Sequence, residues 1–447
     1  MKQDRRDFLR KTAAASAGIA IFPSIVKASS LGLGENIAPS DKKSMIVIGC
    51  GVQGGFDLRQ FLRMDDVQVI AVCDVDDSHS ASAKQRVDNV YGNSDCRIYK
   101  DFREILEKEN PDTALLALPD HWHSIIYCAV ANKRIDVYAE KPLARTIAGS
   151  RAIVDAVQKN NIVWQTGSHQ RSQERFRIAA ELVRNGRIGE IEYIEVGMPD
   201  GIEYAGNPPV QPVPEGVDWD MWLGPAPKVP YRGVMHWNWR WIMDYSGGHL
   251  TDWAGHHIDI AHWGIGMDRS GPVSIEGKGR SNRNGIYNTW VEYDVRCKYR
   301  NGIEMRVANV SKLKHGMGIA WYGTEGWLYV DRGRILEASD PGILEGIKLG
   351  RFDKYNWYDR TNREEIRAYY LKRSHHRNFI DCVLSREETN APAEIGHRSI
   401  SAGLLGEIAI VTGQKLDWDP DKEVFINNDQ ASRLLKKPYR APWKFPV

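Results

Sequence analysis

Three side chains in two distant stretches of the chain have the chemistry needed to take a proton from a hydroxyl group. Lys141 lies between a glutamate and a proline, and Asp252 and His256 lie four residues apart in a later run that contains glycines. If that run is helical from about residue 249, Asp252 and His256 share one face, and the carboxylate orients the imidazole as a general base. Lys141 would hold the substrate hydroxyl and favour its alkoxide form. The spacing therefore predicts oxidation of an alcohol, with Lys141, Asp252 and His256 as the catalytic residues.

Other roles stay open for the same side chains. His249, Asp252 and His256 have a spacing that is compatible with metal ligands, although the lysine makes a metal unnecessary, so no metal is expected. The histidines could instead be buried and hydrogen-bonded, which we expect for His257 and His262. Asp252 could also have a purely structural partner.

A glycine-rich turn near the start of the chain predicts a dinucleotide site. Gly49, Gly51 and Gly54 form the pattern G-x-G-x-x-G between a predicted strand and a predicted helix. These glycines permit a tight turn and let backbone N–H groups reach a pyrophosphate at the helix N-terminus. Asp74 ends the next predicted strand, where an acid accepts a hydrogen bond from a ribose hydroxyl. A carboxylate there repels a 2′-phosphate, so NAD is expected rather than NADP.

The elements that position these residues alternate between strand and helix in the first third of the chain. Short apolar runs that end in polar residues predict buried strands, and amphipathic segments such as 101–109 lie between them. This alternation indicates βαβ units and a doubly wound parallel sheet, which we place in a Rossmann domain over 44–166. The predicted strands are 45–48, 67–74, 113–119, 136–140 and 162–167. Glu140 and Lys141 then lie at the carboxyl edge of the sheet, where such folds bind ligands.

The pattern changes after residue 167. A helix is predicted over 174–185, and later segments alternate apolar and polar residues, as long strands do. These strands are predicted at 190–198, 289–299, 303–310, 318–322 and 327–331, and helix is expected again over 364–413. The sequence thus predicts an α+β domain over 167–415 with a large, mostly antiparallel open sheet. The tail over 416–447 is expected to be extended and to pack on a neighbour or on another subunit.

The second domain must supply the substrate contacts. His169 and Arg171 follow the last Rossmann strand, and Trp239 and Arg240 precede the run that contains the catalytic aspartate. Aromatic rings beside guanidinium groups suit a polyol, because they combine stacking with directed hydrogen bonds. The residues expected to bind substrate are His169, Arg171, Trp239, Arg240, His249 and His256.

The N-terminus predicts export. Residues 1–28 have the features of a twin-arginine signal peptide, with Arg5 and Arg6 before a mild apolar stretch that ends in a small-residue cleavage pattern. The signal directs folded proteins across the membrane, so a periplasmic location is expected. The apolar stretch is shorter than a bilayer requires, and no membrane span is predicted. Residues 29–43 are polar and form a predicted linker.

Charge and composition narrow the classes of partner. The 447-residue chain has a net charge of +2, but residues 1–28 hold six basic and two acidic side chains, which leaves −2 for the rest. Binding to nucleic acid therefore has no electrostatic support. A hydrophobic content of 42% with 26% charged residues is typical of a globular protein of this size with more than one domain.

Taken together, the motifs resemble the Gfo/Idh/MocA oxidoreductases, the family of glucose-fructose oxidoreductase and inositol dehydrogenase. The resemblance covers about 45–415 and rests on the glycine turn, Asp74, Pro119 with His123, the sequence 140–142 and the Gly-Gly-x-x-x-Asp-x-x-x-His run. It implies a Rossmann domain followed by an α+β domain whose open sheet joins subunits into homodimers or homotetramers. It also matches the lysine, aspartate and histidine named above to the family's catalytic trio.

The resemblance adds residues to the predicted cofactor site, and the sequence departs from the family pattern at two positions. His249 stands where the family usually has a third glycine, and Gly255 directly precedes His256, where the family more often has its glycine one residue earlier; neither alters the spacing of the aspartate and the histidine. The residues expected to bind the cofactor are Gly49, Gly51, Val52, Gln53, Gly54, Asp74, Pro119, His123, Glu140 and Lys141.

Export and cofactor use together set the expected reaction. Free NAD is scarce outside the cytoplasm, so we expect NAD to be acquired before export, held tightly and recycled in place. The favoured hypothesis is hydride transfer from a sugar or glycoside hydroxyl, with a pyranoside as the expected substrate and C3 as a candidate carbon. One alternative is redox-neutral glycoside hydrolysis by oxidation, elimination, hydration and reduction. A second alternative is a non-catalytic sugar-binding protein with a structural NAD.

Overall fold

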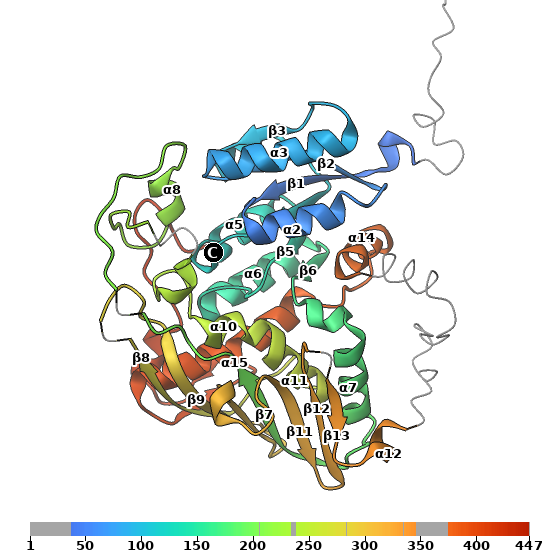
Figure 1. Ribbon diagram of the computed structural model, residues 1–447, viewed down its shortest axis with the longest axis vertical. Coiled ribbons are helices and arrows are strands. Elements are labelled where there is room, and N and C mark those ends of the chain that lie inside the picture. The colour runs from blue at the N-terminus through green and yellow to red at the C-terminus, as the bar shows by residue number, and fades with distance from the viewer. Residues whose placement is uncertain are drawn as a thin grey trace, which may run out of the picture.

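The computed structural model describes residues 37–204, 206–233, 238–282, 284–333, 335–345 and 374–446. The predicted signal peptide, the first part of the predicted linker and the first part of the predicted helix over 364–413 lie outside these residues. Two sheets make up the described part, one above the other in Figure 1, with helices between them.

The first sheet is the predicted parallel Rossmann sheet. Its strand order is β3-β2-β1-β4-β5-β6, and each neighbouring pair is parallel. The strands are β1 Lys43–Ile48, β2 Val67–Cys73, β3 Arg97–Tyr99, β4 Thr113–Leu116, β5 Asp136–Ala139 and β6 Trp164–Thr166. The helices around it are α2 Val52–Phe61, α3 Asp77–Tyr91, α4 Phe102–Lys108, α5 Asp120–Asn132 and α6 Ile147–Asn160. β3 was not predicted, because it is three residues long and two of them are exposed.

The helix boundaries show where backbone donors are satisfied and where they are left for a ligand. The Asp76 side chain accepts from the backbone of Ser78 at the start of α3, and Thr146 accepts from Gly149 at the start of α6. α2 begins after Gly51 without any side-chain cap and without an acidic residue in its first turn. Its first N–H groups therefore point toward the carboxyl edge of the sheet without a side-chain acceptor.

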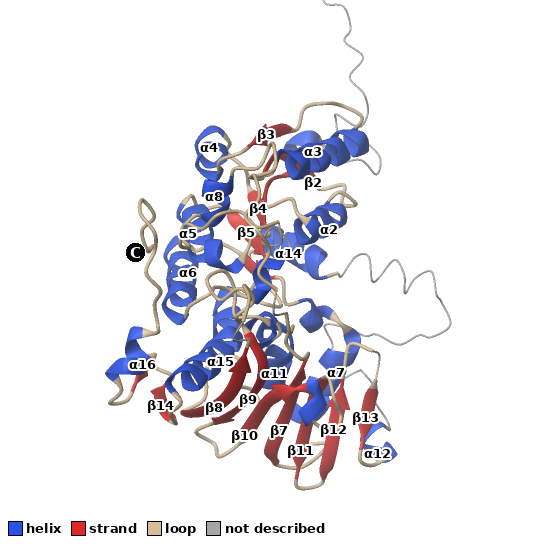
Figure 2. Cartoon of the chain, turned by 60° about the vertical axis from the view of Figure 1, so that its left-hand side comes forward, coloured by secondary structure: helices blue, strands red, loops and turns tan. Residues whose placement is uncertain are grey.

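The second sheet has nine strands and is mostly antiparallel, as predicted. Its order is β13-β12-β11-β7-β10-β9-β8-β14-β15, and the exception to antiparallel pairing is β7 with β10. Figure 2 shows this sheet from β14 to β13, with α15 and α11 lying over one face. The strands are β7 Ile191–Met198, β8 Ser274–Ser281, β9 Trp290–Lys298, β10 Glu304–Asn309, β11 Gly318–Gly323, β12 Gly326–Val330, β13 Leu336–Ala338, β14 Leu416–Asp419 and β15 Val424–Phe425.

The two faces of the second sheet differ in composition. In β9, Tyr293, Val295 and Cys297 are buried beneath the helices, whereas Arg296 and Lys298 on the other face are exposed. The alternation explains why β9 could be predicted from sequence. β8 was not predicted, because its sequence is rich in glycine and charge and only Ile275 in it is buried. The predicted subunit contact concerns the exposed face and stays a prediction.

The helices of the second domain connect the two sheets. They are η4 His169–Ser172, α7 Glu174–Arg184, α8 Trp219–Leu223, η5 Trp239–Trp241, α10 His249–Asp252, the π-helical turn η6 Ala254–Ile258, α11 Asp259–Gly264, α14 His375–Ser385, α15 Ala393–Thr412 and α16 Asp429–Arg433. Shorter turns are η3 Pro39–Asp41, η7 Val310–Lys312 and α12 Pro341–Leu344. α15 packs on α6 of the Rossmann domain and on β8 and η6 of the second domain. Within the described residues, no helix is both long and apolar enough to cross a membrane.

The C-terminal part is helical again over the described part of 364–413, as predicted, where it forms two helices, α14 and α15. They are separate because Arg386 adopts a left-handed conformation and Pro392 precedes α15. The tail is not extended throughout, since β14, β15 and α16 lie within it and β14 pairs with β8. The last residues pack on this same chain, where the Trp443 ring lies 4.7 Å from that of Trp122 in α5.

A buried ion pair joins the Rossmann domain to α15. Two nitrogens of Arg145 contact the two carboxylate oxygens of Glu407 at 2.7 Å, and both side chains are buried. We predict that Glu407→Gln lowers the free energy of unfolding by about 3–5 kcal/mol, because it leaves the guanidinium charge buried without its partner. Chemical denaturation measures the change.

An exposed ion pair of similar geometry provides the control. Arg300 contacts Asp421 at 2.7 Å, and about two thirds of each side chain is exposed, 68% and 65%. Asp421→Asn should leave the free energy of unfolding almost unchanged, because water screens an exposed pair. Equal effects of the two substitutions would show that the Arg145 pair does not stabilise the domain contact.

Candidate active site

A deep cleft lies at the carboxyl edge of the Rossmann sheet, where the strand order reverses between β1 and β4. It encloses about 1250 Å³, including open solvent at its mouth. Sheets of this kind bind ligands at that position. The structure brings nine of the ten predicted cofactor residues into its wall, namely Gly49, Gly51, Val52, Gln53, Gly54, Asp74, Pro119, Glu140 and Lys141.

The three glycines of the turn have different physical roles. A Cβ on Gly54 would lie 2.0 Å from the carbonyl oxygen of Gly49, and a Cβ on Gly49 would lie 2.1 Å from that of Ala117, so the fold itself requires both glycines. A Cβ on Gly51 would meet nothing nearer than the His79 ring at 3.9 Å. The fold does not need this glycine, and its missing side chain leaves space in the cleft beside the uncapped start of α2. This space and these free N–H groups fit the pyrophosphate of a dinucleotide.

The end of β2 supplies the polar corner expected for a ribose. Asp74 accepts hydrogen bonds from the backbone of Cys50 at 2.7 Å and of Asp76 at 3.0 Å, which fixes its carboxylate at the cleft wall. The nearby His79 lies 3.6 Å from the same carboxylate. Hydrogen bonding to Asp74 raises the pKa of His79 above its ordinary value, although burial opposes the shift.

The prediction that His123 binds the cofactor is wrong. Its ring nitrogens contact the carbonyl oxygens of Pro142 at 2.6 Å and Leu118 at 2.8 Å, and the side chain is fully buried. His123 therefore joins the backbone after β5 to the backbone after β4 and does not line the cleft. It supports the loops that carry Pro119 and Lys141.

Lys141 and Asp252 meet across the two domains at the inner end of the cleft. The lysine follows β5, the aspartate ends α10, and Nζ lies 2.8 Å from Oδ1 with only 13% and 15% of the side chains exposed. Gly255 permits this approach, because a Cβ there would lie 3.1 Å from the lysine Cβ. Burial by itself would raise the pKa of Asp252, but the charges of Lys141 and Arg240 outweigh it and hold the pKa below its ordinary value. Asp252 is therefore a carboxylate.

His256 is buried near this pair, but neither His256 nor Asp252 is among the residues that line the cleft, and Asp252 does not orient the imidazole. α10 ends at Asp252 and a π-helical turn follows, so the expected regular helix is interrupted. No hydrogen bond or ion pair joins the two side chains, because the carboxylate faces Lys141 and Arg240, and the buried Nδ1 of His256 has no partner among the described residues. Burial, with the positive charges of Lys141 and Arg332, lowers the pKa of His256 well below its ordinary value. The ring is neutral and can accept a proton.

The alternative metal site is not formed by these residues. His249 donates from Nδ1 to the carbonyl oxygen of Asp200 at 2.7 Å and packs against a tryptophan, so it does not line the cleft either. Within the described ranges, the one group of ligand atoms that converges as metal ligands do lies elsewhere. His257 and His262 are buried and hydrogen-bonded, as expected, to the carbonyl of Gly197 and the hydroxyl of Tyr299.

The structure separates the other predicted substrate residues into two groups. Trp239 and Arg240 line the cleft, and the Arg240 guanidinium lies 4.3 Å from the centre of the Trp239 ring. Arg171 does not, and this prediction is wrong: its guanidinium is buried against Asp259 at 2.7 Å, because that fully buried carboxylate needs a cationic partner.

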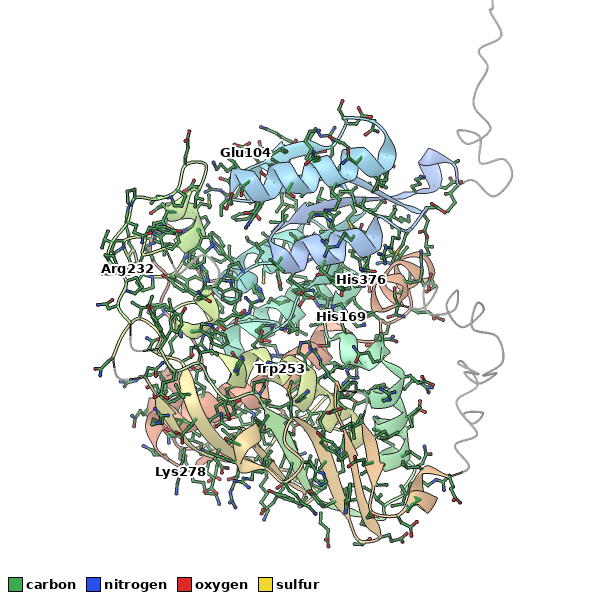
Figure 3. The ribbon with its side chains drawn as sticks, in the orientation of Figure 1. Glu104, His169, Arg232, Trp253, Lys278 and His376 are labelled. Carbon is green, nitrogen blue, oxygen red and sulfur yellow. The ribbon has the colours of Figure 1, made fainter. Side chains whose placement is uncertain are left out.

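His169 also lies outside the cleft. It is on the far side of Glu140, with Nε2 3.3 Å from that carboxylate and 3.1 Å from the Tyr138 hydroxyl. It lines a second cavity instead. Figure 3 shows His169 and Trp253 in the layer between the two sheets.

Some residues of the site were not predicted. The Arg332 guanidinium lies 4.7 Å above the Trp253 ring, and that ring packs against His256. Trp253 follows Asp252 directly and could have been included for that reason, whereas Arg332 is far away in the sequence and has no motif around it. Met221 and Trp222 form the outer wall of the cleft.

The segment that carries this outer wall is attached to the Rossmann domain through its backbone. The N–H of Asp218 donates to the carbonyl of Val75 at 2.9 Å, that of Asp77 donates to Gly216 at 3.2 Å, and Asp76 forms an isolated β-bridge with Val217. The segment over 216–222 is therefore attached to the loop between β2 and α3, beside the cleft.

Comparison with known proteins covers most of the chain. A family model described as "Oxidoreductase family, NAD-binding Rossmann fold" matches residues 43–168, and one described as "Oxidoreductase family, C-terminal alpha/beta domain" matches 201–333 and 339–445. Myo-inositol 2-dehydrogenase of Thermotoga maritima is 27% identical over 370 residues, which is 81% of this chain and 94% of that protein. Alpha-N-acetylgalactosaminidase of Shewanella oneidensis is 24% identical over 42% of this chain and 44% of its own length.

A solved structure supports the fold. Scyllo-inositol dehydrogenase from Lactobacillus casei, with bound NAD(H) and scyllo-inositol, superposes with a TM-score of 0.57 at 15% identity over 84% of this chain and 99% of that chain. The similarity extends through both sheets, so the arrangement of the two domains is a shared one.

The neutral state of His256 has a measurable consequence for stability. Because its pKa is lowered in the folded state, only the unfolded chain binds this proton below about pH 6.5, so acid destabilises the fold. We predict that His256→Gln reduces the loss of unfolding free energy between about pH 6.5 and 5 by roughly 1.4 kcal/mol per pH unit. Urea denaturation across this range provides the measurement. If the unfolding free energies of the wild type and the variant change with pH in parallel, the His256 ring is protonated in the folded protein.

Proposed function

The chain belongs to the Gfo/Idh/MocA family of oxidoreductases, and we propose that it oxidises a secondary hydroxyl of a sugar or cyclic polyol with NAD held in the Rossmann cleft. One observation carries the proposal: Lys141 Nζ lies 2.8 Å from Asp252 Oδ1 at the inner end of the cleft that the glycine turn lines. A fixed cation at that position can hold the oxygen from which the hydride leaves.

NAD is the proposed cofactor, and its nicotinamide supplies the hydride acceptor when it is bound. The uncapped start of α2 and the space beside Gly51 would hold its pyrophosphate. Asp74 would accept from a ribose hydroxyl, and its charge supports NAD over NADP because it repels a 2′-phosphate.

Lys141, Asp252 and His256 are the proposed catalytic residues. Asp252 fixes the Lys141 side chain through a largely buried contact of 2.8 Å. The ammonium of that side chain would donate a hydrogen bond to the substrate hydroxyl and stabilise negative charge as it develops on the oxygen. The neutral imidazole of His256 would accept the hydroxyl proton as the hydride leaves.

The walls around this group suit a polyhydroxylated ring. In the cleft wall, Trp239 supplies a flat apolar surface, and Arg240, which lies over its ring, supplies hydrogen-bond donors. Trp253 and Arg332 do not line the cleft and pack against one another beside His256. Relatives named as inositol dehydrogenases support a cyclic polyol or sugar as the substrate class. The resemblance to an alpha-N-acetylgalactosaminidase covers less than half of either chain, so we favour oxidation over glycoside cleavage.

We also propose that NAD stays bound through the catalytic cycle. Met221 and Trp222 cover the cleft, and the backbone bonds of their segment to the loop between β2 and α3 support slow release. A retained cofactor would be reoxidised in place by a second carbonyl compound. This arrangement agrees with export through the predicted N-terminal signal.

The glycine turn offers a test of the cofactor site. We predict that Gly51→Val weakens NAD binding by about 1–3 kcal/mol, or roughly 5- to 150-fold in Kd, because its methyl groups enter the space left for the pyrophosphate. Calorimetric titration of cofactor-stripped protein measures Kd. Gly55→Val is the matched control, since a Cβ there makes only an ordinary 3.8 Å contact with the Cys50 carbonyl and lies outside the cleft wall. Equal Kd values for the two variants would exclude Gly51 from the cofactor site.

The catalytic proposal is tested on a panel of inositols, pyranoses and glycosides, with product masses and the absorbance of reduced cofactor as readouts. Lys141→Met should lower kcat by about 100- to 10,000-fold while NAD binding persists, because it removes the charge that stabilises the alkoxide. The exposed Lys133→Met serves as control and should retain the wild-type kcat.

The products distinguish the candidate functions. Keto-sugar products support oxidation. Release of free sugar from glycosides without added NAD would instead favour the hydrolase, and no turnover with NAD bound would favour a binding protein.

A further inference from the structure

A second cluster of ionisable side chains lies behind the catalytic cleft, on the far side of Glu140. It joins Asp57 from α2, His169 from η4 and His376 from α14, which are far apart in the sequence. One potential ligand atom from each residue lies within 4.8 Å of the other two. Figure 3 shows His169 and His376 close together where α14 meets the Rossmann domain.

The distances in this cluster suit a small cation. His376 Nε2 lies 2.8 Å from Asp57 Oδ1, and His169 Nε2 lies 3.9 Å from the same oxygen. Ligand atoms that each lie about 2.0–2.2 Å from a zinc ion are separated by roughly 3–4 Å, so small side-chain rotations would bring all three atoms into a coordination shell. Imidazole nitrogens together with a carboxylate oxygen are the donors that Zn²⁺ and similar divalent ions prefer.

A second carboxylate and a glutamine support this cluster from outside. Glu140 Oε1 is 3.3 Å from His169 Nε2, but Glu140 does not belong to the group whose ligand atoms converge. Gln53 Nε2 donates to both oxygens of Asp57 at 3.1–3.2 Å and to Glu140 at 3.3 Å, so one amide orients the two carboxylates toward one another. Hydrogen-bonding partners of this kind fix the ligands in known metal sites.

Burial makes the two carboxylates costly unless positive charge lies beside them. Asp57 and Glu140 are 0% and 5% exposed, and the imidazole of His169 lies beside both, 3.9 Å from Asp57 and 3.3 Å from Glu140. A divalent cation would balance both negative charges and leave both imidazoles neutral, as metal ligation requires. The half-buried His169 and the adjoining His375 and Phe56 line a separate cavity, which gives an ion a path from solvent.

We propose that Asp57, His169 and His376 bind a divalent transition-metal ion, for which Zn²⁺ is the probe. The ion would hold α14 and η4 against α2. The site does not depend on the proposed oxidation, because none of its three central residues lines the cofactor cleft.

The direct test uses the tag-free full-length protein after removal of metals with a chelator. Equilibrium dialysis against ZnCl₂ with elemental analysis should give one tightly bound Zn²⁺ per chain and a higher melting temperature. Co²⁺ as a replacement probe should show the visible absorption of a low-coordinate site with nitrogen and oxygen ligands. Failure to bind either ion stoichiometrically would overturn the proposal and leave the cluster as a hydrogen-bonded clamp.

Variants locate the site. Asp57→Asn and His376→Gln should each weaken Zn²⁺ binding by more than the roughly 10- to 100-fold that loss of an outer supporting partner costs. His315→Gln is the control, because this histidine stacks on Tyr329 in the second sheet, away from the cluster. Unchanged affinity in both cluster variants would contradict the assignment.

Anomalous diffraction from zinc-soaked wild-type crystals keeps the proposal testable if a variant does not fold. A peak between Asp57 and His376 supports the site, and a bound ion located only elsewhere refutes it. NAD binding by the metal-free protein, measured in parallel, separates a failure of this site from a failure of the proposed function.

Discussion

The catalytic arrangement depends on one electrostatic constraint: a lysine from the Rossmann domain and an aspartate from the second domain must be held in contact, largely away from water. Lys141 and Asp252 are 111 residues apart, and their 2.8 Å contact exists only if the two domains keep a fixed relation. An ion pair this buried gains little net stability by itself, so other contacts must bring the groups together. The Ser168 hydroxyl, which donates to the carbonyl of Gly255 at 2.8 Å, and the Ser246 hydroxyl, which donates to Asp120 at 2.7 Å, are two such contacts. The long helix α15, packed on elements of both domains, is the scaffold for all of them.

The elements that could be predicted from the sequence are those whose residues repeat with a regular period. The buried parallel strands and β9 follow such periods, and the glycine turn has a local signature. β3 and β8 were missed because neither has a regular apolar pattern, and they form a sheet only through pairing with β2 and β9. The break between α14 and α15 depends on one left-handed residue, Arg386, which helix periodicity does not reveal.

The functional residues divide in the same way. Gly51, Asp74 and Lys141 were found because each lies at the end of a strand, where the topology alone brings it to the cleft. Arg171 and His123 were misassigned, because an arginine or a histidine is equally able to bind a ligand. Only the structure shows that the Arg171 guanidinium contacts a buried carboxylate and that the His123 ring contacts two backbone carbonyls. The contribution of Arg332 and the cluster around Asp57 arise from distant segments, so no local pattern contains them.

The β-bridge between Asp76 and Val217 has a kinetic implication. Because 216–222 is attached by backbone hydrogen bonds to the loop between β2 and α3, a molecule in the cleft would leave only when this segment separates from that loop. The residence time of the cofactor would then be governed by a local unfolding equilibrium and not by the sum of its own contacts. Solvent additives or temperature changes that loosen this attachment would accelerate dissociation without altering any atom that touches the dinucleotide.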